Sequence, residues 1–577
     1  MNNSKIIFDI EADGLDPTVV WCIVAKEVDG QIHKFNDKQI AEGIKFLESA
    51  DVLIGHNIIG YDIPVLEKLY GAKLTSNVED TLVMSRLFNP IRENGHSLKT
   101  WGWRVGMAKQ EQPEDFDSYS PEMLEYCSQD VRLNELVYKH LLKEGKLFSE
   151  ESIALEHRVA RIMREQERTG FFFDTKQAME LLAELKTKQL EVEDEVHNTF
   201  KPKLVDDKLV TPYVKKSGDL SKRGLTDEEY DRCIKTQSVE PFMRQKLQEF
   251  NLGSRKQIGE YLIDFGWKPE RFTPTGQPIV DEGTLKKITH IHEAKLIADF
   301  LLYQKRIAQI TSWIDELKED RVHGSVIPNG TITGRMTHRN PNMAQVPAVY
   351  SPYGKDCRAC WTVPKGYKLV GIDASGLELR MLAHYMNDEE YINEIINGDI
   401  HTTNQKLAGL ESRDTAKTFI YALVYGAGDE KIGKVIGGTR KQGSELKRNF
   451  LDNLPSLKNL KDKVQRASAR GFLKGLDGRK IYVRSQHAAL NTLLQGGGAI
   501  VMKKAMCFLQ DLIDLNVLDA KFVANIHDEW QIQVKESQAD LVGQLGVESI
   551  EKTGKHFNMR CPLTGEYKIG GNWSETH

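Results

Sequence analysis

The sequence lacks membrane-length hydrophobic runs, a disulfide framework and a targeting segment. No run reaches the roughly 18 apolar residues of a membrane span, and we expect no membrane partner. The 7 cysteines include one CxxC pair, Cys357 and Cys360, without the second pair that a zinc ribbon needs. The N-terminus shows no signal or transit pattern. These absences favour a cytoplasmic protein with free thiols.

An excess of positive charge is also missing. The chain has 78 Lys and Arg against 83 Asp and Glu, a formal net charge of −5. Any basic groove for nucleic acid must therefore be local and offset by acids elsewhere, and some of those acids can be metal ligands.

A chain of 577 residues is too long for one hydrophobic core, so we expect two to four domains. Short apolar strands, Lys5–Ile10, Val20–Glu27 and Val52–Ile54, alternate with helical patterns near the N-terminus and predict an α/β domain. Helical periodicity follows from about 150 to 200 and from about 251 to 318. The Lys-rich segment between them is interpreted as an insertion or a solvated surface loop. Strands and helices mix from 320 to the end.

Acidic residues occur in three segments of the N-terminal domain. Asp9 and Glu11 lie two apart on an expected strand and so share one face. Asp62 stands in Asn-x3-Tyr-Asp at the start of an expected helix. Tyr126 and Asp130 are one helical turn apart. Each feature alone has an ordinary explanation, such as a helix cap or an exposed pair. Carboxylates together on one face favour bound cations.

The stretch "VANIHDEWQIQV" predicts a hairpin, at least half buried, with His527, Asp528 and Glu529 at its turn. Adjacent carboxylates there are costly through repulsion and desolvation. Asp373 ends another strand, "KLVGID", just before a helix that opens around Ser375. On adjacent strands, Asp373 and Asp528 can bind two Mg²⁺ and a triphosphate, because Mg²⁺ prefers hard oxygen ligands.

A third pattern lies on the expected helix "RDTAKTFIYALVYGAG". Arg413, Lys417 and Tyr421 are spaced i, i+4, i+8 and line one face, with Tyr425 one turn further. Two such cations can grip a polyphosphate, and an aromatic ring can stack on a nucleobase. Taken alone, the helix is better explained as an amphipathic helix with solvated cations and an aromatic residue in the core.

In their order, the three N-terminal segments resemble the motifs of Tyr-containing DEDD 3′→5′ exonucleases. "DASGLELR", "RDTAKTFIYALVYG" and "HDE" resemble motifs A, B and C of family A DNA polymerases. "TGRMTHRNPNMAQVP" and "LNTLLQGGGAIVMKKA" are similar to the replicative enzymes of short-tailed bacteriophages. The resemblance implies an RNase H-like exonuclease domain followed by a right-hand polymerase, with an antiparallel palm sheet and helical fingers and thumb. The implied domains are exonuclease 1–148, thumb 149–318 with an insertion at about 200–250, palm 319–390, fingers 391–485 and palm again 486–577.

The resemblance also implies roles for individual residues. Two Mg²⁺ per active site, or Mn²⁺ as a substitute, would be held by Asp373 and Asp528 in the polymerase and by Asp9, Glu11, Asp62 and Asp130 in the exonuclease. Glu529 corresponds to the third acid of motif C, Lys417 to the proton donor for pyrophosphate, and Tyr126 to the residue that orients the attacking water. Groups near the nucleotide would be His401, Arg413, Lys417, Tyr421 and Glu378, which excludes a 2′-OH. DNA contacts would come from Arg335, Gln345, Gln495 and His527.

The predicted activity is template-directed DNA synthesis with 3′→5′ proofreading, as in a phage replicative polymerase located in the host cytoplasm. Predicted partners are primer–template DNA and dNTPs. Host thioredoxin or another processivity factor and a helicase–primase are further candidates. Three alternatives stay open: a DEDD nuclease whose C-terminal half only binds nucleic acid, a single-subunit RNA polymerase, and a non-catalytic replication scaffold.

Overall fold

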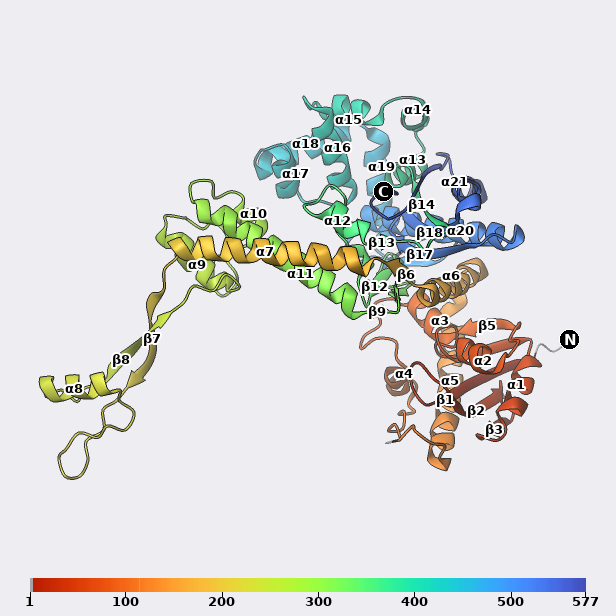
Figure 1. The fold of residues 1–577 in the computed structure, drawn as a ribbon. Coiled ribbons are helices and arrows are strands. Elements are labelled where there is room, and N and C mark those ends of the chain that lie inside the picture. Colours follow the sequence, from red (N-terminus) through yellow and green to blue (C-terminus); the bar gives the residue numbers. More distant parts are fainter. Residues whose placement is uncertain (1–3, 114) are drawn as a thin grey trace. The chain divides into compact units, whose positions relative to one another are not determined.

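The structure is a computed structural model and describes residues 4–113 and 115–577. The chain forms two compact units, one comprising Met1–Asp174 and Glu316–His577 and the other Thr175–Asp315 (Figure 1). No helix in the described ranges combines the length and the apolar character needed to cross a bilayer.

The N-terminal part of the first unit is a five-stranded sheet in the order β3-β2-β1-β4-β5. Strand β1 pairs antiparallel with β2 and parallel with β4. The strands are β1 Lys5–Ala12, β2 Val20–Glu27, β3 Ile32–Phe35, β4 Val52–Gly55 and β5 Asn77–Asp80. The helices are α1 Ile40–Glu48, α2 Asp62–Tyr70, α3 Thr81–Phe88, α4 Leu98–Val105 and α5 Pro121–Glu144, followed by the turn η1 Gly145–Leu147. The three predicted strands are confirmed, with β1 running two residues further.

Alternation along β1 separates two apolar cores. Ile6, Phe8 and Ile10 join one buried cluster, while Ile7 joins another with residues of α5. Because successive side chains point to opposite faces, Asp9 and Glu11 lie on the Ile7 side, toward α5.

The C-terminal part of the first unit is built on an antiparallel sheet in the order β17-β18-β14-β19. Its strands are β14 Tyr367–Ala374, β17 Ala520–Ile526, β18 Glu529–Lys535 and β19 Gly565–Gly570. Helix α21 packs on β14 and β19, and α6 packs on β17 and α20. These helices are α6 Glu150–Thr169, α20 Ala489–Leu515 and α21 Ala539–His556, preceded by the turn η4 Glu536–Gln538. A second four-stranded sheet, with shorter strands, has the order β13-β6-β10-β9. Its strands are β6 Phe171–Phe173, β9 Leu317–Lys318, β10 Arg321–Val322 and β13 Trp361–Thr362. Strands β11 Ser325–Ile327 and β12 Thr337–Arg339 form a hairpin.

Helices dominate between β14 and α20. They are α13 Leu377–Met386, α14 Glu389–Asn397, α15 Ile400–Ala408, α16 Arg413–Val424, α17 Asp429–Val435, α18 Arg440–Asn453 and α19 Pro455–Ser468, followed by the hairpin β15 Phe472–Lys474 and β16 Lys480–Tyr482. Short helical segments also occur at η2 Met343–Gln345, α12 Gly354–Ala359 and η3 Gln486–Ala488. Helix α16 buries Ala416, Phe419 and Ile420, which leaves its cationic face free for another purpose.

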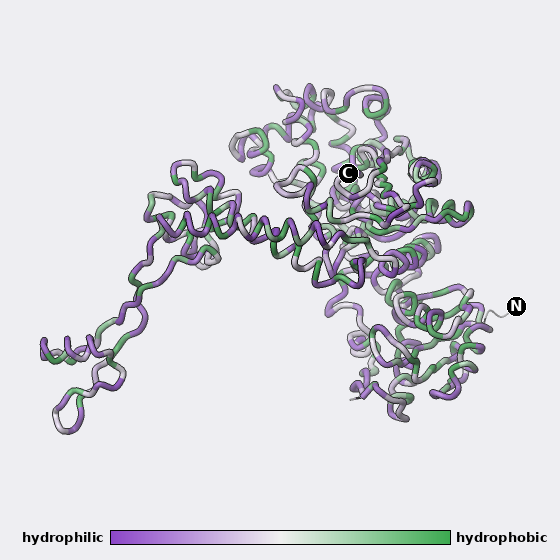
Figure 2. The backbone as a smooth tube through the Cα atoms, viewed as in Figure 1, coloured by the Kyte–Doolittle hydropathy of each residue, from purple (hydrophilic) through white to green (hydrophobic). Residues whose placement is uncertain are grey.

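The second unit consists of the adjacent helices α7 Thr175–Thr199 and α11 His292–Asp315 with α9 Arg255–Asp264 and α10 Glu282–Leu285. The Lys-rich segment is not a plain loop, which corrects the prediction. Strand β7 Lys203–Val210 pairs antiparallel with β8 Phe242–Gln248, and α8 Asp227–Thr236 lies between them in the chain. Figure 2 shows hydrophobic residues scattered among hydrophilic ones along this ribbon. The lysines and turn formers suggested a loop, but "KLV" on both sides of Asp206 and Asp207 supplies strand-forming residues.

Candidate functional sites

The exonuclease-like acids gather beside β1. Asp62 is the first residue of α2 and is buried, and its Oδ1 accepts a hydrogen bond of 3.2 Å from the backbone N–H of Ile10. Tyr126 and Asp130 lie one turn apart on α5 and are both buried. Ligand atoms of Asp9, Glu11 and Cys127 lie within 4.8 Å of one another. The strand, the helix start and the long helix thus bring the predicted carboxylates into one cluster.

Burial raises the pKa of every acid in this cluster. It raises the pKa of Asp9 well above its usual range, with further contributions from Asp62, Glu11 and Asp130. It raises the pKa of Glu11 to about 8 and that of Asp62 to about 7. Carboxylates that repel one another in a poorly solvated site gain from bound cations.

Lys109 is a residue of this cluster that sequence reasoning missed. Its Nζ forms an ion pair with Asp130 Oδ2 and lies 4.7 Å from the centre of the Tyr126 ring. Burial lowers the pKa of Lys109, but Asp130 beside it raises it by more. A lone lysine in the segment after α4 carries no sequence signal, because the contact exists only once α5 packs nearby.

The cluster fits a divalent cation. Asp130 Oδ1 is buried and has no hydrogen-bond partner among residues 4–113 and 115–577. An unpaired buried carboxylate oxygen is costly unless a cation or water engages it. With Asp9 and Glu11 it offers the hard oxygen ligands that Mg²⁺ prefers.

The second acid cluster lies where β14 and β18 end side by side. Asp373 pairs in register with Glu529 and with Glu566. The backbone N–H of Ala374 donates a 3.1 Å hydrogen bond to the carbonyl oxygen of Asp528. Asp373 and Asp528 are therefore brought together across the sheet. The hairpin is buried along both strands, as predicted, but its turn consists of His527 and Asp528 alone.

Burial also raises the pKa values of these two aspartates. The pKa of Asp373 rises to about 6, with Glu529 and Glu566 adding to the effect. That of Asp528 rises to about 7, with contributions from Glu378 and Asp373. Unneutralised carboxylates at a strand end and in the adjoining turn are a suitable donor set for divalent cations.

Glu529 differs from its neighbour because the protein itself satisfies it. As the first residue of β18 it is buried, and it accepts hydrogen bonds from Trp573 Nε1 at 2.8 Å and Gln531 Nε2 at 2.5 Å. Its Oε2 lies 2.5 Å from His577 Nδ1. Burial raises the pKa of Glu529, but these partners outweigh it and hold it lower. Trp573 and His577 were not predicted, since they lie far from Glu529 in sequence.

The cations of α16, Arg413 and Lys417, are exposed beside its buried stripe. Arg413 forms a two-point ion pair with Asp399, Nε to Oδ2 at 2.7 Å and NH2 to Oδ1 at 3.0 Å. The rings of His401 and Tyr421 have centroids 6.1 Å apart. Burial lowers the pKa of His401, and the nearby cations Lys417 and Arg413 lower it further. Predicted nucleotide contacts thus cluster on α15 and α16.

Glu378 connects the remaining groups. The Tyr425 hydroxyl donates a 2.5 Å hydrogen bond to Glu378 Oε1, and Arg335 NH2 lies 3.8 Å from the same oxygen. Arg335, Glu378, His527 and Asp528 line one cavity of about 30 Å³. Gln345, on η2, is exposed and Gln495, on α20, is half-buried; neither lines this cavity.

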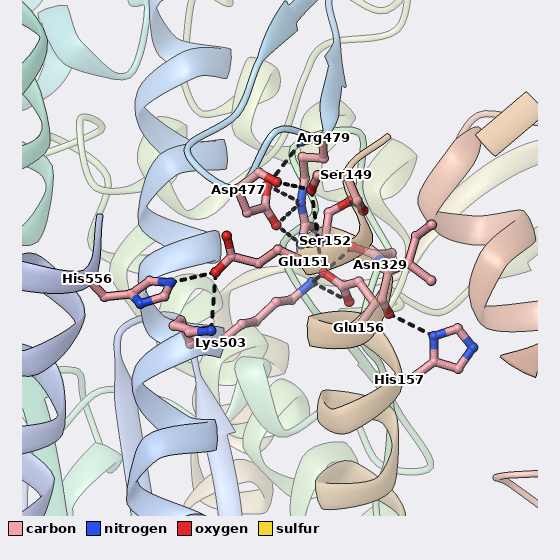
Figure 3. Close-up of polar contacts among 12 residues, drawn as sticks. Ser149, Glu151, Ser152, Glu156, His157, Asn329, Asp477, Arg479, Lys503 and His556 are labelled. Carbon is pink, nitrogen blue, oxygen red and sulfur yellow. Dashed lines mark hydrogen bonds and ion pairs between the residues drawn. The ribbon is translucent and has the colours of Figure 1, made fainter. Parts of the chain in front are cut away.

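A buried network of charged and polar side chains surrounds Glu156 (Figure 3). Glu156 on α6 accepts hydrogen bonds from Arg479 NH1 at 2.5 Å and Lys503 Nζ at 2.8 Å. Arg479 also pairs with Asp477, and Lys503 donates a 2.9 Å hydrogen bond to Asn329 Oδ1. Asn329 lies in the β11–β12 loop that also contains Arg335, and Lys503 lines the same cavity as Arg335. The network therefore joins α6 to the wall of the polymerase-like site.

Comparison with known proteins identifies the family. The model of DNA polymerase family A matches residues 225–575. The DNA-directed DNA polymerase of Enterobacteria phage T3 is 34% identical over 706 aligned positions, covering 99% of this chain and 100% of that protein. The chain belongs to DNA polymerase family A. The DNA-directed DNA polymerase of Escherichia phage T7 is 35% identical over 91% of this chain and 92% of that protein. The T3 alignment is longer than this polymerase, so that relative has residues that this chain lacks.

The fold agrees with the family. The polymerase domain of Pol1 from M. smegmatis, solved in complex with DNA primer-template and dNTP, superposes with a TM-score of 0.80 at 17% identity, covering 100% of this chain and 96% of that one. The predicted multidomain fold, family and DNA-directed DNA polymerase activity are confirmed, and the nuclease-only alternative is not favoured. Polymerases of this family use divalent metals, generally Mg²⁺. The individual site residues and the domain boundaries stay predictions.

Proposed function

We propose that this polymerase extends a primer at Asp373 and Asp528 and removes mispaired 3′ ends at the Asp9 cluster. The hydrogen bond from the Ala374 N–H to the Asp528 carbonyl oxygen carries the first assignment, because it fixes two desolvated carboxylates at one end of the sheet. The buried acids around Asp9 carry the second.

Divalent ions bound at Asp373 and Asp528, two for each active site and with Mn²⁺ able to replace Mg²⁺, would acidify the primer hydroxyl and stabilise the departing pyrophosphate. His401, Arg413 and Lys417 bind the triphosphate, and Lys417 donates a proton to the pyrophosphate. To bind the triphosphate, Arg413 must release Asp399 and pair with a phosphate instead. A guanidinium group can make this exchange because it binds a carboxylate and a phosphate through the same two-point geometry.

Base-pair geometry is read around Glu378. Tyr421 packs against the nascent pair, while Glu378, held by Tyr425, crowds a 2′-OH. Arg335, Gln345 and Gln495 contact minor-groove acceptors that are common to all correct pairs. His527 lies beside the primer end.

In the exonuclease, Tyr126 orients the attacking water, while Asp9, Glu11, Asp62 and Asp130 hold the cations. Lys109, paired with Asp130, lowers the pKa of this carboxyl group against the effect of burial. A single strand enters more readily than a duplex, so a frayed mispaired end is selected.

The ribbon of β7 and β8 is the proposed docking site of a processivity factor, with host thioredoxin as the candidate. Leu204 faces Leu247 and Leu209 faces Met243 across the ribbon. Leu204 is 66% exposed, Leu247 64% and Leu209 63%. The cations of the opposite face are largely paired, Lys203 with Asp264, Arg244 with Glu229 and Lys246 with Asp207. An apolar face with neutralised cations favours a protein partner over DNA.

Primer extension tests the main proposal. With Mg²⁺ the protein should add dNTPs, discriminate strongly against rNTPs and lose activity in EDTA. Incorporation of rNTPs alone would instead indicate an RNA polymerase, and no incorporation of either would indicate a scaffold or a nuclease.

Product length tests the docking proposal. Added thioredoxin should lengthen the products of the wild type but not those of Leu204→Ser/Leu247→Ser. Lys208→Gln, on the opposite face, is the matched control. Wild-type products that do not respond to thioredoxin would exclude it as the partner.

A further inference from the structure

Another cavity, of about 230 Å³, is lined by residues of the exonuclease part and of the polymerase part of the first unit. One wall comes from α3 and from the loop containing Asn57 and Gly60, just before Asp62 of the exonuclease cluster. The other comes from α6 and from the β11–β12 hairpin, whose loop contains Arg335. The cavity therefore lies between an element of each site.

Three arginines line this cavity, Arg86 on α3, Arg164 on α6 and Arg339 on β12. Neither Arg86 nor Arg339 forms an ion pair with an acid in the described ranges. Arg164 NH1 is 3.7 Å from Glu167 Oε1, and Arg164 Nε is buried without a hydrogen-bond partner among the described residues. These guanidinium groups have unused donors.

The two acids of the lining are already engaged. Asp80 accepts hydrogen bonds from the backbone N–H groups of Asn57 and Ile59 at 3.0 Å each and caps α3. Glu167 accepts a 2.8 Å hydrogen bond from Ser325 Oγ. Three cations against two acids leave the lining with an excess of positive charge. Its remaining lining is partly apolar, with Leu82, Val83, Met163, Val326 and Ile327.

We propose that this arginine cavity binds the backbone of the single-stranded primer end while it passes between the polymerase and exonuclease sites. Guanidinium groups bind phosphate through two parallel hydrogen bonds and need no particular base. The apolar lining suits sugars and unstacked bases. The volume is below the roughly 300–1,000 Å³ of sites for drug-sized ligands, which suits one phosphate with its sugar. This inference rests on the proposed proofreading function.

The test compares excision of a mispaired primer end with two reactions that need no transfer. Single-turnover rates are measured for a mismatched primer–template, for a single-stranded trinucleotide, and for extension of a matched primer. Arg86→Gln/Arg164→Gln should slow the first reaction about tenfold, as expected for lost charge-assisted hydrogen bonds, and leave the other two unchanged. Arg168→Gln, on the exposed side of α6 and paired with Glu165 at 2.7 Å, is the control and should behave as wild type.

Arg164→Gln alone decides the matter if the double variant fails to fold, because Arg164 Nε contributes no hydrogen bond to the fold. Arg86→Lys/Arg164→Lys, which keeps the charges, should recover part of the rate. Mismatch excision at the wild-type rate in both glutamine variants would overturn the inference. So would an equal loss with the trinucleotide, since the arginines would then serve the exonuclease site itself. A wild type that cleaves no trinucleotide would instead refute the proposed exonuclease.

Discussion

The two acid clusters of this polymerase hold their carboxylates in different ways. The exonuclease cluster gathers acids from a strand and two helices, and Lys109 is paired with only one of them. The polymerase cluster places Asp373 on β14, in register with Glu529, and holds Asp528 in the adjoining turn by the backbone hydrogen bond from Ala374. The third acid, Glu529, is satisfied by Trp573, Gln531 and His577. The sheet therefore fixes the positions of the acids in the polymerase site, whereas the positions of the acids in the exonuclease site depend more on bound cations.

Because the two acid clusters are built from different elements, we expect that one activity can be abolished while the other persists. Replacing Asp9 and Glu11 by alanine should abolish degradation of single-stranded DNA, by about a thousandfold or more, because several kcal/mol of cation-based stabilisation is lost. Primer extension should persist. Hydrolysis and extension rates on separate substrates check this. Joint loss of both activities would contradict the two-site account.

A second prediction concerns the buried network that joins α6 to the polymerase side. Glu156→Gln should reduce the free energy of unfolding by roughly 3–5 kcal/mol, because it leaves buried Lys503 and Arg479 without their shared partner. Denaturant unfolding measures the change. Glu151→Gln is the control. Glu151 pairs with Lys504 at 3.2 Å and with His556 at 2.5 Å in a more exposed setting, so its loss should cost about 0–1 kcal/mol. An equal loss of unfolding free energy in Glu156→Gln and Glu151→Gln would show that the buried network does not stabilise the fold more than an exposed ion pair does.

A smaller effect is expected at Tyr421. With tyrosine at position 421 the enzyme should accept dideoxynucleotides readily. Tyr421→Phe should increase discrimination against dideoxynucleotides by about tenfold, which is the scale of one hydrogen bond. The ratio of kcat/KM for dNTP and ddNTP measures this. A ratio that the substitution leaves unchanged would count against the role of Tyr421.

The acids could be predicted because local periodicity places them. Asp9 and Glu11 share a face by strand alternation, Tyr126 and Asp130 by one helical turn, and Asp373 ends an apolar strand. Lys109, Trp573, His577 and Arg479 could not, because each acts through a contact with residues distant in the chain, and a single sequence carries no trace of such packing. The β7–β8 ribbon was missed as a strand pair because its cross-strand partners lie about 40 residues apart along the chain.

Nucleotide addition by Asp528→Asn in Mg²⁺, measured in a single turnover on a matched primer–template, tests the central assignment most directly. We expect a fall of about a thousandfold or more, with trinucleotide hydrolysis unchanged and the hairpin still folded. Addition at the wild-type rate would contradict it.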